Sequence, residues 1–126
     1  MQSGPDFRVR RVYEPAGPAD GRRVLVDRLW PRGLSKERAA VDEWLRDVTP
    51  SNGLRTAYHS GQLDFAGFRD RYRAELAEPA HAAAVGRLLG LARTSAVTLV
   101  TAVKEPEHSH VAVLVDHLRQ RHDAHE

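Results

Sequence analysis

The segment 96–103, AVTLVTAV, restricts the fold more than any other part of the 126-residue chain. It is apolar on both faces of an extended strand, and charge follows at once in Lys104 and Glu105. A second apolar run, residues 24–26 (VLV), ends in the same way at Asp27. Strands that are apolar on both faces belong in the centre of a parallel sheet whose two faces are both covered. These two runs therefore predict an α/β protein.

Strand and helix patterns alternate along the rest of the chain. Strands are predicted at 7–13, 23–27, 41–48 and 96–103. Helices are predicted at 35–40, 51–58, 64–78, 80–93 and 109–121, with N-caps at Ser35, Ser51 and Asp64. The segment 41–48 also fits helical spacing, and we favour a strand there.

This alternation predicts one layered α/β domain over residues 7–121. It should hold a small, mostly parallel sheet of about four strands flanked by helices. Residues 1–6 are expected to be disordered, because the run is short and rich in Gly, Pro and polar residues. The polar tail 122–126 is expected to be frayed for a similar reason.

The composition excludes several kinds of site. The chain has no cysteine, which excludes disulfides, thiolate metal sites and cysteine nucleophiles. No apolar run approaches the ~18 residues of a membrane span, and residues 1–11 lack the apolar segment of a signal peptide. We therefore expect a cytoplasmic protein with no membrane partner. The net charge of +2 is low for a non-specific nucleic-acid binder, so nucleic acid is an unfavoured partner.

Polar residues gather at the predicted strand ends, where α/β proteins bind ligands. The first group is Asp27, Arg28, Arg32 and Gly33, just before a predicted helix start. Guanidinium groups and the free N–H groups of a helix start favour an anion. The structural alternative is an Asp–Arg pair that fixes the loop while Trp30 fills the core.

Two further groups follow. Lys104, Glu105 and His110 could supply acid and base groups, and His110 lies where a helix dipole disfavours the imidazolium. The alternative is a solvated helix entry. Ser51 and Arg55 are one helical turn apart and could face one ligand, although an N-cap is the simpler role for Ser51.

Metal and cofactor motifs are missing from the sequence. The seven His residues form no His-Glu-x-x-His pattern, and there is no Gly-rich phosphate loop. We therefore expect no metal site and no bound cofactor.

Three stretches taken together point to a known family. They are RVYEPAGPADGRRVLVDRLWPRGLSKE, DEWLRDVTPS followed by LRTAYH, and F..RYRAEL. This pattern resembles the YeaO-like family of small bacterial proteins over roughly residues 8–118, with DRLWPRG as its most specific part. The resemblance implies an intracellular single-domain α/β protein without an established activity.

The same stretches are similar to a broader group of domains with two motifs. The first motif is Asp-Val-Arg-x-x-Pro at a strand end, and the second is Glu-Lys-x-Pro-x-x-Cys-His-Arg. The residues that fall on these motifs are Asp27, Arg28 and Pro31, then Lys104, Pro106 and His110. Ser109 replaces the Cys and Val111 replaces the Arg. These departures favour binding by the first motif over catalysis by the second.

Two functions remain open. In the first, a small anionic ligand such as phosphate or a nucleotide is bound at the strand edge by Arg28, Arg32, Gly33, Ser51 and Arg55. This version allows an enzyme, whose candidate catalytic residues are Asp27, Lys104, Glu105 and His110. In the second, Trp30 and the Arg-rich loop form a protein- or nucleic-acid-binding regulatory module, since Trp and Arg dominate interface hot spots. The sequence does not specify an oligomeric state.

Overall fold

The computed structural model describes residues 7–124, and it describes side chains up to residue 121. The segment expected to be disordered, 1–6, and the last two residues of the expected tail, 125–126, lie outside the described residues. Within the described part, no helix is both long and apolar enough to cross a membrane.

The sheet has four parallel strands in the order β1-β4-β2-β3. The strands are β1 (Phe7–Arg11), β2 (Arg22–Leu25), β3 (Glu43–Trp44) and β4 (Val97–Thr101). All five residues of β4 are buried, and this strand lies between β1 and β2 as its doubly apolar sequence predicts. The predicted α/β class with a small parallel sheet is therefore confirmed.

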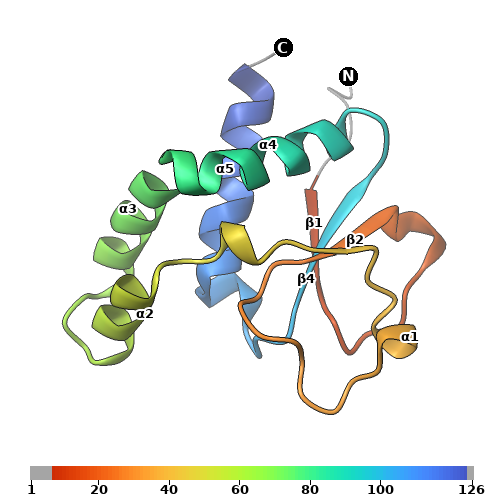
Figure 1. The fold of residues 1–126 in the computed structure, drawn as a ribbon, viewed down its shortest axis with the longest axis horizontal. Helices are drawn as coiled ribbons and strands as arrows, with labels where there is room; N and C mark the ends of the chain where they lie inside the picture. The colour runs from red at the N-terminus through yellow and green to blue at the C-terminus, as the bar shows by residue number, and fades with distance from the viewer. Residues whose placement is uncertain (1–6, 125–126) are drawn as a thin grey trace.

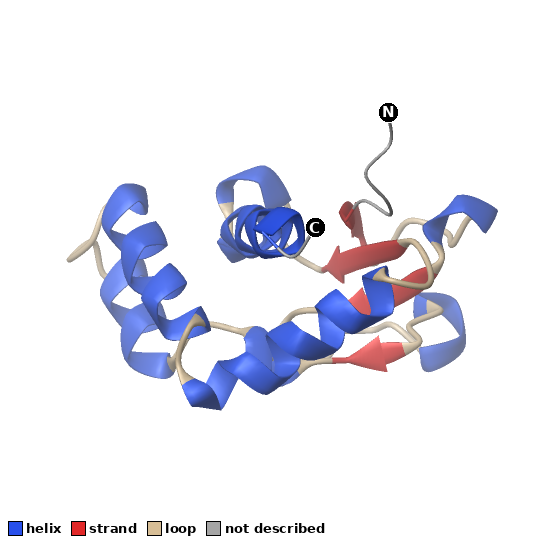
Figure 2. Ribbon diagram, turned by 90° about the horizontal axis from the view of Figure 1, so that it is seen from above, coloured by secondary structure: helices blue, strands red, loops and turns tan. Residues whose placement is uncertain are grey.

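Helices cover the two faces of the sheet unequally. They are α1 (Lys36–Ala39), α2 (Asn52–His59), α3 (Phe65–Leu76), α4 (Pro79–Ala92) and α5 (His110–Ala124). Val24 and Leu99 point into the larger core with α3, α4 and α5, whereas Leu25 and Val100 point into a smaller core with α1. Figures 1 and 2 show α2 and α3 beyond the sheet rather than on it. The helices α2 and α3 therefore form a wall beyond one end of the sheet.

The helices begin where their caps predict. The side chains of Ser35, Ser51 and Asp64 each accept a hydrogen bond from the backbone N–H three residues later. These bonds satisfy N–H groups that have no partner within the helix. The last helix begins one residue after the expected Ser109 and continues to Ala124, three residues past its expected end.

The segment 41–48 is only partly the predicted strand. Glu43 and Trp44 pair with β2, and a 3-10 turn, η2 (Arg46–Val48), then turns the chain away. Val48 lies fully buried in the core that α3 and α4 share, a place that a continued strand would not reach. Long-range burial therefore decides where β3 ends.

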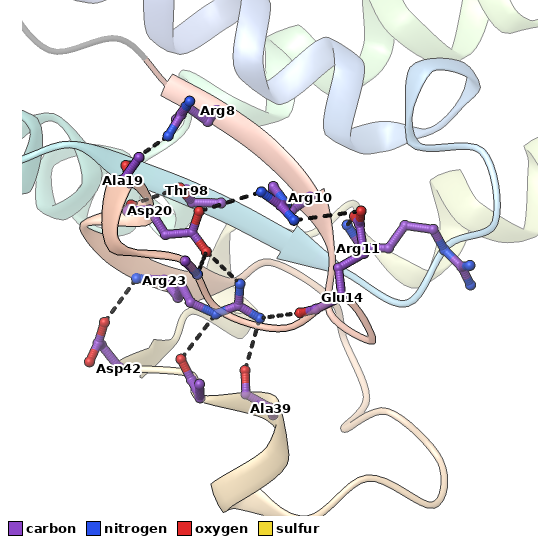
Figure 3. Close-up of polar contacts among 12 residues, drawn as sticks. Arg8, Arg10, Arg11, Glu14, Ala19, Asp20, Arg23, Ala39, Asp42 and Thr98 are labelled. Atoms are coloured by element: carbon purple, nitrogen blue, oxygen red, sulfur yellow. Dashed lines mark hydrogen bonds and ion pairs between the residues drawn. The ribbon is translucent and has the colours of Figure 1, made fainter.

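A buried ion pair at the start of β2 was not foreseen from the sequence. Arg23 and Asp20 are each 2% exposed, and the Arg23 Nη1 donates to the Asp20 Oδ2 at 2.8 Å. Figure 3 shows the same guanidinium group pointing at the end of α1, where it donates to the carbonyls of Ala39 and Ala40 at 3.0 and 3.1 Å. Arg23 thus ties β2 to α1, and Asp20 balances its charge.

The environment of Asp20 favours its ionised form. Burial alone would raise the pKa of this carboxyl. Hydrogen bonds from the Gly17 N–H and Arg23, together with the positive charges of Arg10 and Arg23, outweigh burial and hold the pKa below its ordinary value. The stabilisation is present at neutral pH and is lost as the pH falls through this lowered pKa.

We expect the change Arg23→Met to destabilise the fold strongly. It would leave the buried Asp20 carboxylate without its closest cation and two carbonyls without their donor. Breaking a buried pair in this way costs about 3–5 kcal/mol in the free energy of unfolding. Urea denaturation measures this loss.

Arg87→Met is the matched control, because Arg87 also pairs with a carboxylate, Glu43 at 2.9 Å, but on the surface. Its loss should be much smaller, since solvent screens the pair. Equal losses in the two variants would show that the burial of Arg23 carries no special weight.

Candidate functional site

A cleft of about 590 Å³ lies where β2 and β4 end. Its lining comes from the loop after β2 (27–32), from α2 and the residues before it (49, 50, 55, 58, 59), and from the segment that leads into α5 (102, 103, 108–110). Figure 1 shows α2 and the start of α5 at this end of the sheet. The position agrees with the rule that open parallel sheets bind ligands beyond the carboxyl ends of their strands.

Asp27 connects the two strands that border the cleft. Its Oδ1 accepts the Thr101 hydroxyl at 2.6 Å and its Oδ2 accepts the Ala102 N–H at 2.7 Å. Its carbonyl also accepts the indole N–H of Trp44 at 2.7 Å. The carboxylate therefore holds the end of β2 against β4. Among the described residues, no hydrogen bond or ion pair joins it to the exposed Arg28.

His110 lines the cleft, and its Nε2 lies 3.7 Å from the Asp27 Oδ1. The same Nε2 is 2.8 Å from the carbonyl oxygen of Val26, which can only accept, so Nε2 carries the hydrogen. The other nitrogen, Nδ1, is then an acceptor, and it has no hydrogen-bond partner among the described residues.

The pKa of His110 is lowered. Burial is the main cause, and the positive charge of Arg55 acts in the same direction. The Val26 carbonyl and the Asp27 charge oppose the shift without overcoming it. The lowered pKa disfavours the imidazolium at neutral pH, and burial is its main cause.

Three Arg side chains line the cleft without a partner. Arg28 and Arg32 are exposed and Arg55 is half-buried. Within residues 7–121 none of these guanidinium groups forms a side-chain hydrogen bond or an ion pair. Among the described lining residues Asp27 is the one carboxylate, and both its oxygens are engaged, so this lining has an excess of unpaired positive charge.

The structure brings together five of the predicted site residues and leaves four outside. Asp27, Arg28, Arg32, Arg55 and His110 line the cleft; Gly33, Ser51, Lys104 and Glu105 do not. Gly33 has φ of 74° and makes the turn into α1. Ser51 caps α2 and bonds to Glu75, and Lys104 and Glu105 are exposed on the outward turn after β4.

Two further placements bear on the predicted functions. The Ser109 Oγ donates to the Pro106 carbonyl at 2.8 Å and accepts the Val111 N–H at 3.1 Å, so it holds the start of α5. Trp30 is half-buried, and its indole N–H donates to the Leu34 carbonyl at 2.6 Å.

Sequence reasoning placed no ligand contacts at several residues that line the cleft. Leu29 and Phe68 line the cleft, and neither was among the expected site residues. The available signal was an apolar Leu29 next to Trp30 in a loop that also carries Arg28 and Arg32.

The chain belongs to the family whose model is described as the inactive DUF488-N3 subclade, which matches residues 6–126. It is 45% identical to the "Uncharacterized protein YeaO" of Escherichia coli, over 90% of this chain and 97% of that protein. It is 46% identical to the "Uncharacterized protein Rv3073c" of Mycobacterium tuberculosis, over 90% of this chain and 94% of that protein. These findings confirm the YeaO-like resemblance. No solved structure matches the chain significantly.

Replacing Arg55 should move the titration of His110. In the unaltered protein we expect an Nε2–H tautomer at neutral pH and a pKa below the ordinary ~6.5. Arg55→Ala removes a neighbouring positive charge and should raise this pKa. Long-range proton–nitrogen NMR correlations of the imidazole, followed over pH, measure both properties.

The control is Arg71→Ala on α3, which lies outside the cleft lining and should leave the titration unchanged. Since the unfolded chain takes up this proton first, stability should also fall as the pH drops from ~6.5 towards the folded pKa. An Nδ1–H tautomer, or a folded pKa at or above the ordinary value, would contradict the assignment.

Proposed function

We propose that the protein binds a small anionic ligand in this cleft and does not transform it. The observation that carries the proposal is the charge of the lining. Three unpaired guanidinium groups, of Arg28, Arg32 and Arg55, face a cleft whose one carboxylate is already bonded to β4. An anion would supply the missing negative charge.

Arginine suits this role because of its shape. Its planar fork donates two parallel hydrogen bonds to a phosphate or carboxylate. Arg55 is half-buried beside His110, where reduced solvent screening strengthens its attraction for an anion. Arg28 and Arg32 are exposed and would act at the rim.

Binding without turnover fits the state of three of the four candidate catalytic residues, Asp27, Lys104 and Glu105. Asp27 is engaged by Thr101 and Ala102, and the Ser109 hydroxyl is engaged by Pro106 and Val111. Lys104 and Glu105 lie outside the cleft lining. The family description also names this subclade inactive.

A protein- or nucleic-acid-binding module gains less support. That function would use Trp30 as an exposed contact residue. The indole is half-buried, donates within its own loop and lies edge-on to Trp44 with ring centroids 5.5 Å apart. Trp30 therefore has a role in holding the loop.

Titration with ribose 5-phosphate tests the proposal. Calorimetry should show saturable binding, and the ligand at 100 times its dissociation constant should raise stability by ~2.7 kcal/mol. The affinity should fall as salt rises, because Arg28 and Arg32 are exposed. Arg55→Ala should weaken binding at least tenfold, and the triple change with Arg28→Ala and Arg32→Ala should abolish it.

Arg71→Ala again serves as the control and should bind like the unaltered protein, since this exposed Arg lies outside the cleft lining. If ribose 5-phosphate and inorganic phosphate both fail to bind, or if the triple variant binds as well as the control, the anion site is refuted.

A further inference from the structure

The exposed apolar side chains of the described residues lie at the cleft. The large ones are Tyr13, 46% exposed, and Leu29, 73% exposed. They come from different segments, one after β1 and one after β2, yet both line the cleft. Exposed apolar groups that gather at one concave site mark a contact for an apolar surface. A bare inorganic anion offers none.

Two aromatic rings of the lining are held in place before any ligand arrives. Tyr58 stacks on Phe68 with ring centroids 4.6 Å apart and an angle of 25° between the planes. Trp30 is fixed by its bond to the Leu34 carbonyl and by the ring of Trp44. Because these rings lose little freedom on binding, their contacts with a flat ligand would carry little entropic cost.

The polar groups of the cleft are also more varied than an anion alone requires. The Nδ1 of His110 is an acceptor, and the Tyr58 hydroxyl has no partner among the described residues. An acceptor in an otherwise cationic cleft suits a ligand that also carries an N–H or O–H donor. The cleft volume of about 590 Å³ is ample for such a molecule.

We infer that the ligand is a nucleoside monophosphate, whose phosphate is bound by the unpaired Arg groups and whose base lies against the aromatic lining. The inference rests on the proposed anion site and adds a planar ring to it. A base supplies the flat apolar surface for Tyr58, Tyr13 and Leu29. It also supplies N–H groups that can reach an acceptor such as His110.

Calorimetry with matched probes separates the two contributions. The probes are ribose 5-phosphate, the four nucleoside 5′-monophosphates, and the corresponding nucleosides. At least one nucleotide should bind tenfold or more tighter than ribose 5-phosphate, which corresponds to about 1.4 kcal/mol. The nucleosides should bind at least tenfold more weakly than their monophosphates.

Tyr58→Leu keeps an apolar side chain but removes the ring, so it should erase most of the nucleotide's advantage while leaving ribose 5-phosphate unaffected. Phe65→Leu is the matched control, because Phe65 contacts Tyr58 with centroids 6.2 Å apart but does not line the cleft. Leu29→Ser is a second variant that keeps the fold, since this side chain is exposed. It should weaken nucleotide binding several-fold.

Each possible result tests a different part of the inference: the ring contact, the residues assigned to it, or the anion site. If ribose 5-phosphate binds as tightly as every nucleotide, the inferred ring contact is wrong and the anion site stands. If the Phe65 and Tyr58 variants behave alike and Leu29→Ser has no effect, the assigned ring site is wrong. If no phosphorylated probe binds, the proposed function fails and the inference fails with it.

Discussion

The Asp27 carboxylate is the contact on which the cleft depends. It bonds to the hydroxyl of Thr101 and the N–H of Ala102, and so fixes where the loop after β2 begins. Arg23 fixes the other end of the segment between β2 and β3, because it donates hydrogen bonds to the last carbonyls of α1. Burying a charged group is costly unless hydrogen bonds or an opposite charge compensate it. Asp27 accepts hydrogen bonds from Thr101 and Ala102, and Arg23 pairs with Asp20. Their structural roles leave the Arg groups of the loop between them free to meet a ligand.

Much of the fold follows from local sequence signals. The apolar run of β4 predicted a central strand, and the caps at Ser51 and Asp64 predicted two helix starts correctly. The burial of Arg23 could not be predicted in this way. Its partners are the Ala39 and Ala40 carbonyls, which only the tertiary fold brings to it. For the same reason the pattern could not reveal that β3 ends after Trp44.

The sequence predicted the site residues whose position in the fold is set by the end of a strand. Asp27 and Arg28 follow β2, and His110 opens the helix after β4, so the rule for parallel sheets placed them together. Lys104 and Glu105 satisfy the same rule in sequence but lie on the outward turn, where their side chains are exposed. A strand end thus specifies the region of a site, and the path of the next few residues decides which side chains enter it.

Ser109 shows how a residue in a site can be structural. Its hydroxyl donates to the Pro106 carbonyl and accepts the Val111 N–H, so its donor and one acceptor position are already used. To act as a nucleophile it would have to release the start of α5, and losing such a cap costs ~1 kcal/mol. That same helix start positions His110, which faces the cleft as a neutral acceptor. The bonds of Ser109 therefore favour a fixed binding surface at the entry to α5 over a reactive hydroxyl.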